Sequence, residues 1–163
     1  MSISLHEASA AAYIRGFRVL VELLGKARDH GGDTLVEARL APDMFNLAGQ
    51  IQRASDTAKF AIARVAEVEG PSFKDDETTI EQLIKRIDDT VAWIKSVPAE
   101  KVDAGASRTI TRKFGASERT FSASEYLMVF ALPNFYFHVT TAYDILRHNG
   151  VGVGKLDYLG FTG

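Results

Sequence analysis

Apolar residues recur every three to four positions along four long stretches of the chain, which is the spacing of one face of an α-helix. The first stretch runs from Leu5 to about Asp29, where the sequence HGG ends it. The second runs from about Asp43 to Val68 and is followed by a Gly-Pro pair. Because Pro42 disfavours a helical conformation at the residue before it, we expect this helix to begin at Asp43.

Two sequences that match capping boxes open the other two predicted helices. Thr78-Thr79-Ile80-Glu81 precedes an apolar face that runs from Ile80 to Val97. Ser122-Ala123-Ser124-Glu125 precedes a helix that reaches about Asn149, with Gly150 as its stop. Pro133 lies inside this last helix and removes one backbone donor, so we expect a kink or a division there, with the carbonyl near Val129 left without its helical partner.

The segment between residues 98 and 122 has a different pattern. It contains the β-branched sequence RTITRKF and a turn at Gly115-Ala116, which predicts a short β-hairpin at about 108–121 or an extended crossover. Four long helices without a strong strand run predict an all-α fold, an up-down four-helix bundle with one long connection, formed by a single domain over residues 1–163. The glycine-rich tail carries Leu156, Tyr158, Leu159 and Phe161, so we expect it to pack on the bundle.

Composition excludes several classes of protein. The 163 residues include 46% hydrophobic and 25% charged residues, which is ordinary for a globular domain. A net charge of −2 provides no global field for nucleic acid, and the absence of cysteine excludes disulfides and thiolate sites. Charged side chains interrupt the first twenty residues, so we expect no leader, no membrane partner and a cytoplasmic location.

Polar residues gather on one face of the last predicted helix. Asn134, His138 and Thr141 follow a spacing of four and three, so they lie along one line of the surface. The second predicted helix offers polar partners, namely Gln50, Gln52 and Asp56. One interpretation is a buried, satisfied hydrogen-bond network, and the other is the floor of a pocket in which His138 acts as an acid or base.

A metal ion is a further hypothesis for this cluster. If a divalent metal binds, the expected ligands are His138, Asp56 and Asn134, which provide one imidazole and several oxygen donors. His148 lies ten residues from His138, about 15 Å along a helix, so the two histidines cannot share one ion. We expect His6 and His30 to be surface residues, and we expect no other cofactor.

A modest basic patch lies in the predicted hairpin and consists of Arg108, Arg112, Lys113 and Arg119. Such a patch can bind an anion. Charged residues on an edge hairpin also prevent edge-to-edge strand pairing, and the sequence leaves both interpretations open.

Three stretches of the chain carry a family resemblance: PNFYFHVTTAYDILRHNGV, RLAPDMFNLAGQIQRASDTAK and FKDDETT. They resemble a bacterial family known only as a domain of unknown function, within the DinB/YfiT-like superfamily of metal-dependent four-helix bundles. The resemblance covers nearly the whole chain. It implies a bundle with a long connection between the second and third or the third and fourth helices, and it implies a homodimer.

The resemblance also implies a degraded metal site. Metal-binding relatives carry a His-x-x-x-His pair on the last helix and a third histidine on the second. His138 matches the second ligand of that set, Asn134 replaces the first, and Gln50 or Gln52 stands where the third is expected.

Three hypotheses of function follow from the degraded site. The first is binding of an unknown small molecule, or an unidentified activity that needs no metal. The second is a non-catalytic, dimerising bundle, and the third is a metal-dependent thiol transferase or hydrolase with a replaced ligand set.

Overall fold

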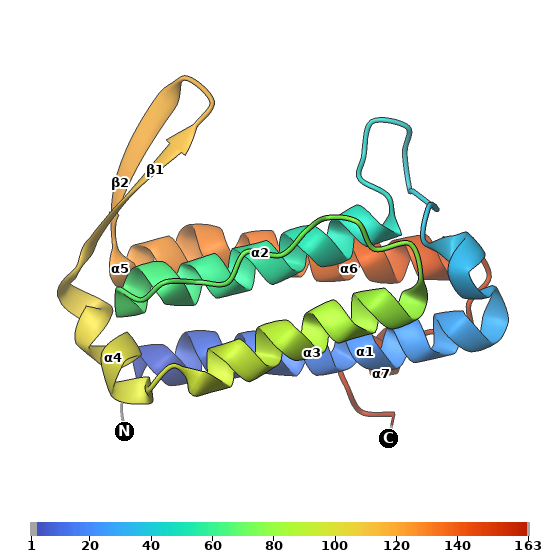
Figure 1. Ribbon diagram of the computed structural model, residues 1–163, viewed down its shortest axis with the longest axis horizontal. Helices are drawn as coiled ribbons and strands as arrows, with labels where there is room; N and C mark the ends of the chain where they lie inside the picture. The colour runs from blue at the N-terminus through green and yellow to red at the C-terminus, as the bar shows by residue number, and fades with distance from the viewer. Residues whose placement is uncertain (1–2, 163) are drawn as a thin grey trace.

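A computed structural model describes residues 3–162 and contains a bundle of four long helices (Figure 1). These are α1 (Ala12–His30), α2 (Leu47–Ala66), α3 (Ile80–Ser96) and α6 (Leu132–His148). Helices α1 and α2 each pack against both α3 and α6. The all-α four-helix bundle expected from the sequence is therefore confirmed.

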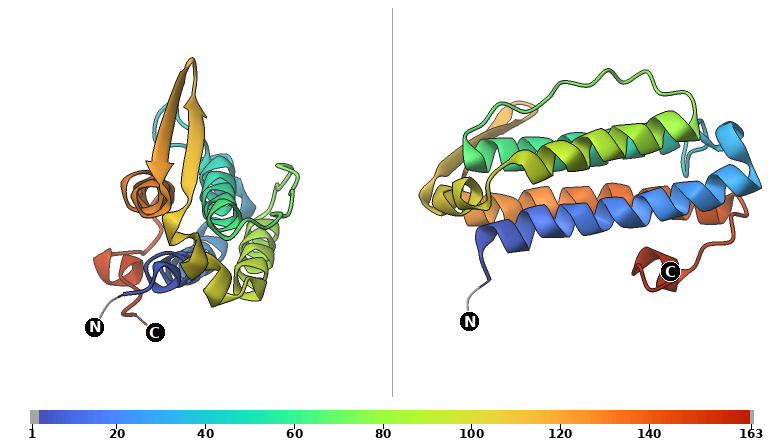
Figure 2. Two further views of the ribbon diagram at one scale, coloured as in Figure 1. Left: turned by 90° about the vertical axis from the view of Figure 1, so that its left-hand side faces the viewer. Right: turned by 60° about the horizontal axis from the view of Figure 1, so that its bottom comes forward.

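The helices run up, down, down and up in chain order. The connection over residues 67–79 follows the outside of the bundle from the end of α2 to the start of α3, so these two helices are parallel (Figure 2). Asp33, just after α1, accepts a hydrogen bond from the backbone N–H of Ile80 at 2.8 Å. This contact joins the end of α1 to the beginning of α3, as an antiparallel pair requires.

Short elements complete the chain between the long helices. Two π-helical turns cover Glu7–Ala11 and Tyr126–Ala131, and two 3-10 turns cover Gly32–Leu35 and Gly105–Ser107. Three short helices are α4 (Ala99–Ala104), α5 (Ala123–Glu125) and α7 (Lys155–Tyr158). Among the helices of the described residues, none is long and apolar enough to span a membrane.

Helix α2 is shorter than the sequence pattern predicts at both ends. The expected start at Asp43 is wrong, because Asn46 caps the helix by accepting a hydrogen bond from the N–H of Gly49 at 2.8 Å. The expected end at Val68 is also late. Glu67 adopts a left-handed conformation with φ of 52°, and this ends the helix at Ala66.

The two predicted capping boxes have different outcomes. The box that opens α3 is shifted by one residue, since Thr79 and Gln82 exchange the two capping hydrogen bonds in place of Thr78 and Glu81. Ser122 caps the last helical stretch as expected and accepts from the N–H of Glu125 at 3.3 Å.

The last helical stretch is divided next to Pro133. The π-helical turn Tyr126–Ala131 ends immediately before α6, and Pro133 lies in the first turn of α6. A proline is tolerated there because the first turn of an α-helix needs no intrahelical donor. The N–H of Leu132 donates to the carbonyl oxygen of Leu127, five residues earlier, so Pro133 follows directly after the π-type hydrogen bonds.

A β-hairpin projects from one end of the bundle (Figures 1 and 2). Its strands are β1 (Thr109–Phe114) and β2 (Ser117–Ser122), so the hairpin predicted at about 108–121 is confirmed. Ile110 pairs with Phe121, and both are buried. This face of the hairpin therefore points to the bundle, and the ring of Phe114 meets that of Phe130 at 4.9 Å between centroids.

The C-terminal tail packs on the bundle only in part. Val151 and Val153 are buried, and Asp157 of α7 forms an ion pair with Lys26 of α1 at 2.6 Å. Leu156 and Phe161 are exposed, contrary to expectation.

Candidate functional site

Three side-chain hydrogen bonds join α2 to α6 and to the π turn before it. His138 pairs with Gln50 at 2.8 Å, Asn134 with Thr57 at 2.8 Å, and Tyr126 with Arg64 at 3.1 Å. The α2 partners are seven residues apart, or about two helical turns, so they lie on one face. We call these three pairs the polar seam.

His138 is held in one protonation state at the end of the polar seam. Its side chain is buried, with 8% of the residue surface exposed, and its Nδ1–H donates to Oε1 of Gln50. Gln50 in turn donates its amide to the carbonyl oxygen of Phe45 at 3.1 Å, which fixes the amide orientation. Burial, assisted by the positive charge of Arg53, lowers the pKa of His138 to about 4. The imidazole is therefore neutral at pH 7, with the lone pair on Nε2.

The structure separates the other residues of the predicted cluster. Thr141 donates to the carbonyl oxygen of Phe137 in its own helix at 2.8 Å. Gln52 donates to Glu77 in the outer connection at 2.8 Å. Gln50, rather than Gln52, is thus the α2 residue that bonds His138. Thr57, which hydrogen-bonds Asn134, was missed by the sequence analysis.

Asp56 is surrounded by cations. Its carboxylate lies 2.8 Å from Nζ of Lys59, 3.1 Å from Arg86 and 3.1 Å from Arg53. Lys59 is only 1% exposed, and its ammonium group lies over the ring of Phe73 at 4.3 Å. Asp56 is therefore the counter-ion of a buried cation pair.

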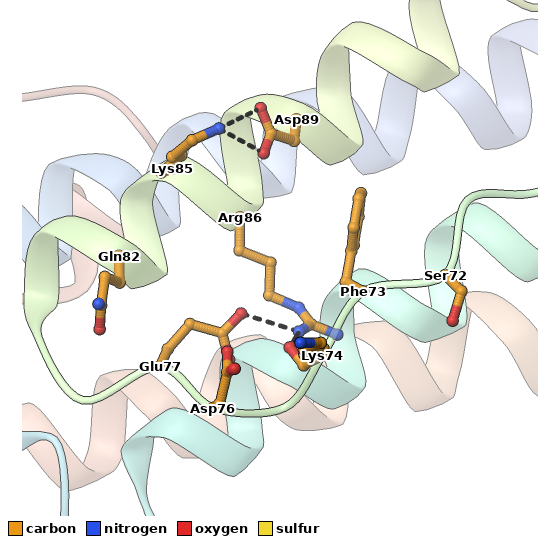
Figure 3. Close-up of a pocket in the computed structure, with 9 residues that line it drawn as sticks. All are labelled: Ser72, Phe73, Lys74, Asp76, Glu77, Gln82, Lys85, Arg86 and Asp89. Carbon is orange, nitrogen blue, oxygen red and sulfur yellow. Dashed lines mark hydrogen bonds and ion pairs between the residues drawn. The ribbon is translucent and has the colours of Figure 1, made fainter.

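The same ionic cluster fastens the outer connection to α3. Arg86 reaches from α3 to Glu77 at 2.9 Å and to Asp75 at 3.0 Å, beside a surface cavity of about 300 Å³ (Figure 3). Burial alone would raise the pKa of Glu77, but hydrogen bonds from Arg86 and Gln52 outweigh it and lower the pKa. Because each charged side chain in this cluster has a partner of opposite charge, we interpret the cluster as structural: it holds the outer connection against α3.

The donors around His138 do not fit a three-ligand transition-metal site. Over residues 3–162, no group of three or more His, Asp or Glu side chains is placed to hold a metal ion. His138 provides one imidazole nitrogen, Gln50 and Asn134 provide amides, and Asp56 is already shared by three cations. Transition metals prefer sets of nitrogen and sulfur ligands.

A second cavity, of about 290 Å³, adjoins the polar seam between α2, the π turn and β1. We call it the seam cavity. Its polar lining consists of Arg53, Asp56, Thr57, Arg64, Arg112 and Asn134. The rings of Phe60, Tyr126 and Phe130 complete it.

The seam cavity brings together two predicted site residues, Asp56 and Asn134, with arginines that the prediction omitted. A usable signal was present for two of them, because Arg53 and Arg64 share a helical face with Thr57. Arg112 was recognised only as part of a basic patch, since the sequence does not show which hairpin face meets the bundle.

Comparison with known proteins defines the class and then the family. The chain is similar over 96% of its length to a solved structure described as a DinB family member protein from Shewanella denitrificans, with 35% identity, a TM-score of 0.87 and 92% of that chain covered. The molecule is thus a DinB-like helical bundle. Residues 5–159 match the family described as a domain of unknown function, DUF1993, and the chain belongs to that family. No curated protein matches the chain.

Proposed function

We propose that this protein binds a small molecule in the seam cavity. The observation that carries the proposal is one cavity of about 290 Å³ that combines guanidinium, amide and hydroxyl groups with three aromatic rings. Small-molecule sites are concave, start at about 300 Å³ and combine apolar walls with convergent polar groups, and the seam cavity has both with an excess of polar residues. A metabolite of modest size therefore fits this space.

In this proposal His138 has a structural role: it holds two helices of the site together and does not transfer protons. A general base works best when its pKa is near the working pH, and a pKa of about 4 makes His138 a weak base at pH 7. Its hydrogen bond to Gln50 instead joins α6 to α2 next to the Asn134–Thr57 pair. Proton transfer by His138 is the alternative role and requires a bound ligand that raises its pKa.

A fragment screen of the full chain tests the proposal, read by chemical-shift changes in ¹H–¹⁵N spectra. Thr57→Phe places a ring in the seam cavity and should abolish the shifts of fragments that perturb Asn134. The matched control is Ala92→Phe, which adds a ring at an exposed position of α3 and should leave binding unchanged. The proposal fails if no fragment perturbs the cavity residues, or if Thr57→Phe leaves their binding intact.

A purely structural bundle is the second candidate function. It is supported by the polar seam itself, in which His138, Asn134 and Tyr126 each have a partner on α2. It predicts that His138→Ala lowers the free energy of unfolding by about 1–3 kcal/mol, because Gln50 loses its partner. It also predicts that the fragment screen finds no ligand.

A homodimer belongs to the same proposal. Met128 and Val129 are exposed on the π turn, and Val129 lines a cavity together with Phe114 and Phe121 of the hairpin. Exposed apolar patches are typical of interaction surfaces. Light scattering should give twice the mass of the chain, and Val129→Lys should shift the protein towards monomer. A monomeric parent protein would contradict this part of the proposal.

A further inference from the structure

The geometry points to an anionic ligand for the seam cavity: a small molecule whose carboxylate or phosphate group is bound by Arg112 and Arg64 and whose flat apolar part lies against Phe60 and Phe130. This inference rests on the proposed function and specifies the chemical class of the ligand. Four observations support it.

The first observation is that two guanidinium groups of the cavity have no counter-ion within residues 3–162. The Nε of Arg112 is buried and has no hydrogen-bond partner there. Arg64 donates to the neutral hydroxyl of Tyr126 at 3.1 Å and forms none of the ion pairs of the described chain. Both arginines are half-buried, and the buried Nε–H of Arg112 lacks a hydrogen-bond partner among the described residues. A buried donor left without a partner is costly, and a ligand anion would provide that partner.

The second observation is that the cavity holds no spare negative charge. Asp56 is its one acidic lining residue, and its carboxylate already lies within 3.1 Å of Arg53, Lys59 and Arg86. The protein as a whole carries a net charge of −2. The positive excess is therefore local to this cavity, as expected for an anion site.

The third observation concerns the charges of the hairpin. Arg112 pairs directly with Arg119 on the face that meets the bundle, whereas Lys113 pairs with Glu118 on the outer face. Like charges directly opposite each other destabilise a strand pair, and opposite charges stabilise it. Prevention of edge pairing explains the exposed Lys113, but it does not explain an arginine turned towards the bundle. A ligand anion at Arg112 does explain it.

The fourth observation is the shape and chemistry of the lining. A guanidinium group is planar and matches the two oxygens of a carboxylate or phosphate. The guanidinium of Arg64 lies over the ring of Phe60 at 5.4 Å, and the ring centroid of Phe130 lies 5.8 Å from that of Tyr126. Guanidinium groups next to aromatic rings are suited to bind an anionic group that is attached to a flat, apolar ring.

The test uses ¹H–¹⁵N spectra of the full chain, which include the Nε–Hε resonances of arginine. The probes are phenyl phosphate, benzoate, inorganic phosphate and the neutral benzamide, each titrated at constant ionic strength. We expect a saturable shift of the Arg112 Nε–Hε resonance with phenyl phosphate or benzoate, and none with benzamide. The tighter of the two anions distinguishes a phosphate site from a carboxylate site.

Two hairpin variants locate the binding site. Arg112→Gln should weaken the better anion at least tenfold, the loss expected for one charged hydrogen-bonding partner. The control Lys113→Gln makes the same charge change on the outer face and should leave the affinity unchanged. Arg64→Lys keeps the charge but removes the planar fork, so it provides a second test if Arg112→Gln alters the fold.

Each remaining outcome separates this inference from the proposed function. Benzamide binding as tightly as benzoate would overturn the anionic class and leave small-molecule binding standing. The inference also fails if no anion gives a saturable response at Arg112, or if anion binding survives Arg112→Gln. The proposed function fails separately, when the fragment screen finds no ligand of any charge in the seam cavity.

Discussion

His138 on α6 and Gln50 on α2 are hydrogen-bonded to each other, with Nδ1 of the imidazole 2.8 Å from Oε1 of the amide. The family resemblance implies that His138 stands at one ligand position of metal-binding relatives and that Gln50 or Gln52 stands at another. Here the glutamine accepts the imidazole N–H, and the same glutamine donates to the carbonyl oxygen of Phe45. His138 is thus hydrogen-bonded to one of the two α2 glutamines at which the resemblance implies a further ligand.

The buried imidazole should make stability dependent on pH. The pKa of His138 is lowered from 6.5 to about 4, mainly by burial, whereas an unfolded histidine titrates near 6.5. Between these values the unfolded chain binds a proton that the folded chain does not. The neutral His138 side chain therefore contributes fully to the free energy of unfolding above pH 6.5. This contribution is lost as the pH falls towards 4, by at most about 3 kcal/mol.

Urea unfolding of the parent protein and of His138→Gln, between pH 7.5 and 4.5, measures this contribution. The variant lacks the titrating ring, so its free energy of unfolding should depend less on pH over this range. Equal pH dependence in the two proteins would show that His138 does not titrate in the predicted way.

Much of the fold could be predicted from local patterns. Apolar spacing identified α1, α2, α3 and α6, and the turn at Gly115-Ala116 identified the hairpin, because these signals lie within a few residues of each other. The end of α2 was harder to predict from the sequence. Glu67 terminates the helix in a left-handed conformation that few residues other than glycine adopt, so the Gly-Pro pair beyond it was a misleading signal.

The candidate site could be predicted only in part, because the contacts between helices depend on their relative rotation and offset. Periodicity placed Asn134 and His138 on one face of α6, but it could not decide between Gln50 and Gln52 as the partner on α2. It also grouped Asp56 with His138, whereas Asp56 binds the cations Lys59 and Arg86. Helix rotation and hairpin orientation are tertiary properties, and they placed Arg112 in the seam cavity.

Asp56→Asn should destabilise the protein strongly, by about 3–5 kcal/mol, because the buried ammonium group of Lys59 loses its carboxylate partner, whereas Arg86 keeps Glu77 and Asp75. The matched control is Asp89→Asn, which breaks an exposed ion pair with Lys85 at 2.7 Å on α3. That change should cost less than about 0.5 kcal/mol. Urea unfolding measures both values. Similar losses in the two variants would contradict the structural role of Asp56.

Two glycines of α1 should respond to alanine in opposite directions. A Cβ atom at Gly16 would lie 2.5 Å from the ring of Phe135 on α6, so Gly16→Ala should destabilise by about 1–3 kcal/mol. A Cβ atom at Gly25 meets nothing within 4 Å, so Gly25→Ala should stabilise the helix by about 0.5–1 kcal/mol. Thermal midpoints of the two variants check the sign. An unchanged midpoint for Gly16→Ala would contradict the packing of α1 against α6, and a loss for Gly25→Ala would contradict the open space at that position.

Introducing two histidines should create a metal site that the present side chains do not form. Asn134 lies four residues before His138, so a histidine there would share its helical face, and Gln50 is already within hydrogen-bond distance of the His138 ring. Two added imidazoles would give the three nitrogen ligands that a catalytic zinc site uses. We expect Gln50→His/Asn134→His to retain about one zinc or nickel ion per chain after dialysis against a weak chelator, measured by elemental analysis. Asn134→His alone should retain much less, because it provides only two imidazoles. Retention of a stoichiometric metal by the parent protein, lost in His138→Ala, would instead show that oxygen donors complete a site there.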